Sequence, residues 1–91
     1  MNAEQFTQEL QRDGFEMSTR SMEANKHNGL HSHPFEVRAV MLSGELTLRY
    51  EGITQMCRTG DVFTMRAGCE HEEQFGPEGA TYLVGRRQLA A

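Results

Sequence analysis

The stretch that decides the fold is Gly29–Leu48, GLHSHPFEVRAVMLSGELTL, in which two histidines precede a long run of strand-forming residues. Within it, Val37–Leu42 is almost continuously apolar, as a buried strand is. Residues i and i+2 of a strand face the same side, so we expect His31 and His33 to point together. Imidazole is the commonest metal-binding side chain. The pair therefore indicates part of a metal site, although such pairs also occur by chance.

Short strands and turns continue on both sides of this stretch. Glu45–Tyr50 alternates between apolar and polar residues, as a half-buried strand does. Turn residues recur at intervals of about 8–12 residues, which is typical of an antiparallel sandwich or barrel. The expected strands are 15–24, 37–42, 45–50, 53–58, 62–65, 71–75 and 81–86, with a loop at 25–29 and turns at 43–45, 51–52, 59–61 and 75–79.

Residues 2–12 predict a short helix ahead of the strands. Asn2 is a favourable N-cap, and Gln5, three residues later, matches the capping-box pattern. Phe6 and Leu10 lie four residues apart and share one helical face. Because so short a helix is unstable alone in water, that face must dock on the barrel or on a partner subunit.

We divide the chain into an N-terminal helix, 1–14, and a barrel, 15–91, within one domain. The net charge is −4 and no basic stripe occurs, so we expect no nucleic-acid partner. No apolar run is long enough to span a membrane. The polar start lacks the pattern of a signal peptide, so we expect a cytoplasmic protein. A core this small often depends on a partner subunit or a metal ion for stability.

Cys57 and Cys69 are the only cysteines, and their spacing forms no CxxC pair. We expect both to be buried reduced thiols that pack as small apolar side chains. The alternative for Cys69 is a place at the rim of a site, because it lies two residues before His71.

A second stretch, Gly60–His71 (GDVFTMRAGCEH), completes a resemblance to the cupin superfamily of small β-barrels. The first cupin motif, G-x5-HxH-x3,4-E-x6-G, is matched by the two histidines and by Gly44 at the required spacing. The second motif, G-x5-PxG-x2-H-x3-N, is matched by both glycines and the histidine. The chain departs from the motifs where Asn25, Arg66 and Phe75 stand in place of glycine, proline and asparagine. The resemblance covers about residues 15–87 and implies an all-β double-stranded β-helix, the cupin jelly-roll barrel.

The resemblance implies that His31, His33 and His71 bind a divalent transition metal, which is Fe, Ni, Zn, Mn or Cu. The family's glutamate ligand falls at Val37 here. Glu36, one position earlier, faces the opposite side of a regular strand, and only a bulge would turn it inward. The implied site is therefore a three-histidine site with open positions. The missing carboxylate makes the site more positive and favours an anionic or chelating ligand.

Glu73 is the candidate catalytic residue, because it lies two residues after His71 and should face the same interior. It would act as a general base or as a fourth metal ligand. The alternative is that Glu73 belongs to a solvated acidic rim with Glu70 and Glu72.

Other residues have weaker assignments. Phe35, Val37, Ala39 and Met41 share the parity of the two histidines and should line the inner face, where Met65 and Leu83 would join them. His27 is expected to be an exposed loop histidine, Arg38 to face outward, and Arg86 and Arg87 to form a solubilising cluster. Neither Tyr50 nor Tyr82, nor any arginine, has a clear catalytic position.

The resemblance implies a metal-dependent enzyme acting on a small molecule, with oxygenase, isomerase or lyase chemistry. The three-histidine site is similar to that of the cupin thiol dioxygenases. One alternative is a non-catalytic module that binds or senses a metabolite, and another is a barrel whose site is vestigial. The resemblance also implies a homodimer.

Overall fold

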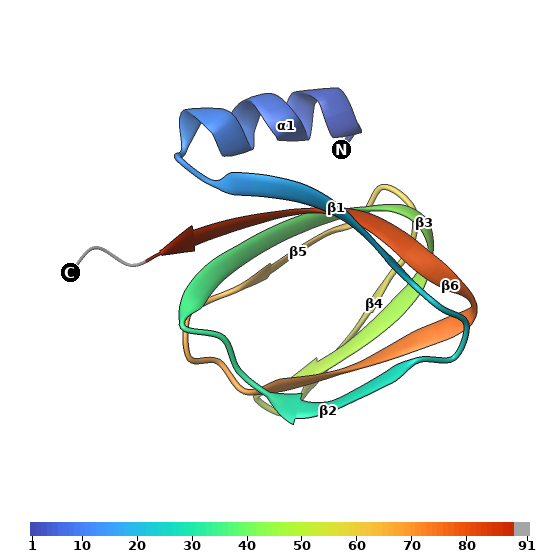
Figure 1. The fold of residues 1–91 in the computed structure, drawn as a ribbon. Coiled ribbons are helices and arrows are strands. Elements are labelled where there is room, and N and C mark those ends of the chain that lie inside the picture. Colours follow the sequence, from blue (N-terminus) through green and yellow to red (C-terminus); the bar gives the residue numbers. More distant parts are fainter. Residues whose placement is uncertain (89–91) are drawn as a thin grey trace.

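One short helix precedes six antiparallel strands in the computed structural model, which describes residues 1–88 (Figure 1). The expected all-β fold with an N-terminal helix is confirmed. Residues 89–91, the end of the expected barrel range 15–91, lie outside the described part. The elements are α1 (Ala3–Arg12), β1 (Glu16–Met22), β2 (His27–His31), β3 (Phe35–Tyr50), β4 (Ile53–Cys57), β5 (Val62–Met65) and β6 (His71–Gln88).

Two long strands, β3 and β6, form the spine of the barrel and pair with each other from Phe35↔Gln88 to Arg49↔Glu72. Each long strand also pairs with two short ones. β6 pairs with β2 near its start and with β1 near its end, while β3 pairs with β5 and then with β4. The strands wrap around a common interior, with α1 outside the barrel wall (Figure 1).

The turns expected at 43–45 and 75–79 are wrong, because both segments are bends inside continuous strands. Gly44 and Gly79 have positive φ values of 79° and 69°. The β3–β6 register shifts on both sides of Gly44, as it does at a β-bulge. Glycine adopts this backbone conformation without steric cost. The chain therefore bends at these glycines and continues in the same ladder.

The loop expected at 25–29 is also partly wrong, since β2 begins at His27 and pairs with β6. Asn28 lies opposite Glu73, and His31 lies opposite His71. This pairing brings the HxH segment beside the start of β6, although the two are about forty residues apart in the sequence. Tertiary pairing thus outweighs the local turn-forming residues of this segment.

Two apolar clusters lie on opposite faces of the sheet. The outer cluster joins α1 to the barrel through Phe6, Leu10, Phe15 and Val40, so the helix docks on its own chain. Asn2 caps the helix as expected, because its Oδ1 accepts a hydrogen bond from the Gln5 amide at 2.8 Å. The inner cluster lies inside the barrel and comprises Ala39, Met41, Leu46, Leu48, Cys57, Phe63, Met65, Cys69, Phe75, Ala80, Tyr82 and Val84.

Most of the inward-facing predictions are confirmed by this division. Ala39, Met41 and Met65 lie in the inner cluster, and Val37 packs against it. Leu83 is the exception, because it packs against the outer cluster. Its neighbour Tyr82 occupies the inward position, and adjacent strand residues face opposite sides. No helix within residues 1–88 has the length and apolarity needed to cross a membrane.

Iodoacetamide is expected to alkylate Cys57 far more slowly in the folded protein than in urea at pH 8. The side chain is fully buried, and this burial, with a contribution from Asp61, raises its pKa to about 11. Only the thiolate reacts, and a free thiol has a pKa of about 8.5. The folded thiol therefore stays protonated at pH 8, where a substantial fraction of the unfolded thiol is ionised. Peptide mass spectrometry measures both rates, and equal rates would contradict this prediction.

Candidate metal centre

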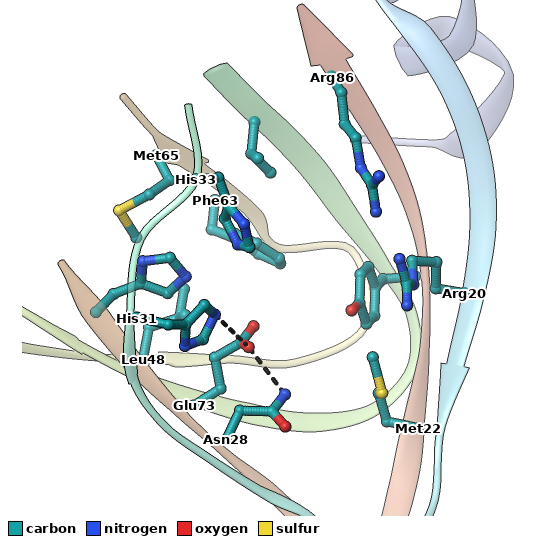
Figure 2. A pocket seen from close by; sticks show the side chains of 13 residues that line it. Arg20, Met22, Asn28, His31, His33, Leu48, Phe63, Met65, Glu73 and Arg86 are labelled. Atoms are coloured by element: carbon teal, nitrogen blue, oxygen red, sulfur yellow. Dashed lines mark hydrogen bonds and ion pairs between the residues drawn. The ribbon is translucent and has the colours of Figure 1, made fainter. Parts of the chain in front are cut away.

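A cavity of about 160 Å³ opens inside the barrel at the end where β2 meets β6 (Figure 2). One part of its wall is polar and carries ionisable groups, and the rest is apolar. The polar lining consists of Arg20, Asn28, His31, His33, His71, Glu73 and Arg86. The remaining lining consists of Met22, Val37, Leu48, Phe63, Met65 and Tyr82.

The three expected histidines meet in this cavity. His31 ends β2, His33 follows two residues later, and His71 begins β6 directly opposite His31. The ring centroids of His31 and His71 are 4.3 Å apart. The ring centroid of His33 lies 5.0 Å from that of His31 and 5.2 Å from that of His71. One ligand atom from each residue lies within 4.8 Å of the other two. The expectation that His31 and His33 point together is confirmed.

This spacing fits a transition metal ion. Two imidazole nitrogens that each bind one ion at about 2.1 Å are at most about 4.2 Å apart. Small side-chain rotations would therefore close the cluster around an ion. Within residues 1–88, the cluster contains three histidines and no carboxylate, so it leaves coordination positions open for water or a ligand.

Backbone carbonyl groups orient two of the imidazoles. The Nδ1 of His31 lies 2.6 Å from the Gly29 carbonyl oxygen, and the Nδ1 of His71 lies 3.0 Å from that of Cys69. A carbonyl oxygen can only accept, so each Nδ1 carries the proton and donates it. In a neutral imidazole held this way, the lone pair is on Nε2, which is the atom that would bind a metal.

His33 is held differently, by stacking on Phe35 at a centroid distance of 5.0 Å and an interplanar angle of 14°. Burial lowers the pKa of His33, and the neighbouring His31 and His71 lower it further. His33 is therefore neutral near pH 7, and neutral imidazole is the metal-binding form. Phe35 was expected on the inner face and lies at the edge of the site through this stack.

Glu73 lies in the cavity and, with a side chain only 13% exposed, is not part of a solvated rim. Its Oε1 is 3.6 Å from Nε2 of His31 and accepts a hydrogen bond from Asn28 Nδ2 at 3.0 Å (Figure 2). The hydrogen bond from Asn28 holds this carboxylate beside the histidine cluster, which is where a base or a further ligand would act. Its catalytic role stays a prediction.

Three other candidates lie outside the cavity. Glu36 pairs with Arg87 at 3.0 Å on the opposite side of β3, so it does not turn inward as a fourth ligand. His27 is exposed and contacts Gln74, although it belongs to β2 rather than to a loop. Cys69 has a buried side chain that does not line the cavity, and it contributes through its backbone carbonyl group instead.

Two arginines of the cavity were missed in the sequence. Arg86 was expected to be solubilising, which is wrong, since it lines the cavity. Arg87 faces outward and donates to Glu36, so only half of the Arg86–Arg87 pair is external. Strand parity could have found Arg86, because it lies two and four residues after the buried Val84 and Tyr82. Arg20 lies opposite Tyr82 on β1 and lines the cavity too.

Tyr82 brings a phenol to the same cavity. Its side chain is buried and its ring stacks on Phe75 at a centroid distance of 6.3 Å. Burial raises the pKa of Tyr82, and the negative charge of Glu73 raises it further. The phenol therefore stays protonated at neutral pH and is available as a hydrogen-bond donor. Tyr50, the other phenol, donates to Gln55 and does not line the cavity.

Comparison with known proteins agrees with the barrel and with the extent of the resemblance. Residues 16–84 match the family model described as the AraC-like ligand binding domain. The matched segment contains every residue that lines the cavity except Arg86. No curated protein matches the chain significantly.

Solved structures show the same fold at low sequence identity. A Rhizobium leguminosarum protein of unknown function has a TM-score of 0.78 at 15% identity, over 82% of this chain and 71% of its own. An RmlC-like cupin from Shewanella frigidimarina scores 0.70 at 15% identity, over 79% and 64%. A Bacteroides fragilis cupin scores 0.68 at 18% identity, over 85% and 68%. The chain therefore spans slightly less than two thirds of the Shewanella cupin.

Proposed function

Because this chain belongs to the AraC-like ligand-binding domain family and has the cupin fold, we propose that it binds a divalent transition metal and a small molecule in one cavity. His31, His33 and His71 hold the ion. The observation that carries this proposal is the convergence of one ligand atom from each histidine within 4.8 Å. Iron, nickel, zinc, manganese or copper would suit this set of donors.

The arrangement of the site supports an ion that remains open to a ligand. A metal bound by three protein ligands supplies Lewis acidity and positions for exchange with water or substrate. The chain's own groups orient the ligands through the Gly29 and Cys69 carbonyl groups. Leu48, Phe63 and Met65 form an apolar part of the cavity wall.

Elemental analysis of the purified protein is expected to find about one transition metal ion per chain. His31→Ala, His33→Ala and His71→Ala should each weaken metal affinity by more than the roughly 10–100-fold cost of losing an outer-shell partner. His27→Ala is the matched control, because it removes an exposed imidazole outside the cluster. Far-UV circular dichroism checks that each variant folds. Equal metal content in all four variants would overturn the proposal.

A metal-dependent enzyme with dioxygenase-like, isomerase or lyase chemistry is the second candidate. The observation that favours it is Glu73, a carboxylate that Asn28 holds 3.6 Å from His31. In that position Glu73 can take or return a proton of a ligand bound at the open positions. Oxygen consumption or product formation identifies the enzyme, whereas ligand binding without turnover identifies the sensing module.

A further inference from the structure

Two arginine side chains line the cavity. Arg20 comes from β1 and Arg86 from β6. Among residues 1–88, neither has an acidic group within ion-pair distance, although five other arginines do. Figure 2 shows both arginines across the cavity from His31 and Glu73. The strand pairing explains this position, since Arg20 lies opposite Tyr82, and Arg86 lies four residues further along β6.

The charges of the cavity do not balance. Arg20 and Arg86 are positive, Glu73 is negative, and the histidines are neutral when they bind a metal. The lining therefore carries one net positive charge, and a divalent ion raises this to three. Such a cavity attracts anions. The planar fork of arginine matches the two oxygens of a carboxylate, with which it forms strong charge-assisted hydrogen bonds.

The size of the cavity restricts the anion. Its volume is about 160 Å³. This volume lies below the range of about 300–1,000 Å³ that is typical of drug-sized ligands. A ligand that lies wholly inside the cavity is therefore small. Met22 and Phe63 in the lining offer apolar contact to a short carbon chain.

We propose that the ligand of this cavity is a short-chain carboxylate, whose carboxylate group binds Arg20 and Arg86 while its other end faces the metal. Only the contact between the other end of the ligand and the metal rests on the proposed function. The arginine contact is independent of the metal, because neither arginine belongs to the histidine cluster.

Calorimetric titration of the metal-loaded protein tests the proposal. It compares the affinities of lactate, malonate and succinate with those of their neutral amides and of inorganic phosphate. At least one carboxylate should bind ten or more times as tightly as its amide. Arg86→Gln and Arg20→Gln should each weaken the binding of that carboxylate by about 10–150-fold. This range corresponds to the loss of a hydrogen bond to a charged group. Arg49→Gln is the matched control, since Arg49 is exposed on the outer face of β3 and should change affinity less than twofold.

The outcomes separate this proposal from the metal proposal. The metal content of the arginine variants should equal that of the wild-type protein. The comparison of carboxylates with amides uses the wild-type protein, so it does not depend on the folding of a variant. Arginine-dependent carboxylate binding in a protein that holds no metal supports the carboxylate site and overturns the metal site. Amides that bind as tightly as carboxylates, phosphate that binds more tightly than all of them, or no binding by any probe overturns the carboxylate proposal.

Discussion

Removal of the metal ion by a chelator is expected to lower the unfolding midpoint of the protein by roughly 15–30 °C. A ligand present at a thousand times its dissociation constant, and bound only to the folded state, stabilises that state by about 4 kcal/mol. In a domain of this size, each kcal/mol shifts the midpoint by about 4–8 °C. The ion would join the end of β2 to the start of β6 through His31 and His71. Thermal unfolding followed by circular dichroism, with metal and with EDTA, measures the shift.

Two variants show whether the shift arises at the histidine cluster. His71→Ala removes a buried ligand and should abolish most of the difference between the metal and EDTA samples. His27→Ala should retain the whole difference. A wild-type protein with the same midpoint in both samples contradicts the prediction, and so does a full shift in His71→Ala.

Gly44→Ala is expected to destabilise the fold by roughly 4 kcal/mol, which combines about 1–3 for the backbone conformation with about 1–3 for steric overlap. Gly44 has φ of +79°, and a Cβ atom there would overlap the backbone carbonyl oxygen of Gly79. Backbone atoms of a paired strand cannot move aside as a flexible side chain can. Total stability of a small domain is about 5–15 kcal/mol, so the variant should lose a large part of it. Urea unfolding gives the difference.

Gly52→Ala is the matched control for this prediction. Gly52 has a similar φ of +75°, but a Cβ atom there meets nothing within 4 Å. Its substitution should cost only the contribution of the backbone conformation, about 1–3 kcal/mol. Equal losses of stability in the two variants would show that the contact between β3 and β6 at Gly44 is not the cause.

The same glycines show where sequence reasoning on secondary structure fails. Ser43-Gly44-Glu45 has the composition of a turn, and the segment ending at Gly79 has it as well. Turn composition reports that the chain must bend, but it does not report whether the strand ladder continues through the bend. Gly44 remains in register with Ala80, so the long strands depend on a partner distant in the sequence.

The sequence by itself determined the features that depend on local spacing. The Asn2 cap, the Phe6–Leu10 face and the inward parity of Ala39 and Met41 follow from helix and strand periodicity. Strand spacing also predicted that His31 and His33 point together, but His33 lies beyond the end of β2, so their convergence is a property of the folded chain. The third histidine was placed by resemblance to the cupin motifs.

Only the tertiary structure decided which distant residues share the cavity. His71 meets His31 because β2 pairs with β6, and Arg20 enters because β1 pairs with the other end of β6. Glu73 lies beside the cluster while Glu36 pairs with Arg87 outside it. Periodicity gives the face of one strand on which a side chain lies, but the neighbours of that face come from pairing and closure of the barrel. The charge of the cavity is therefore a property of the folded chain.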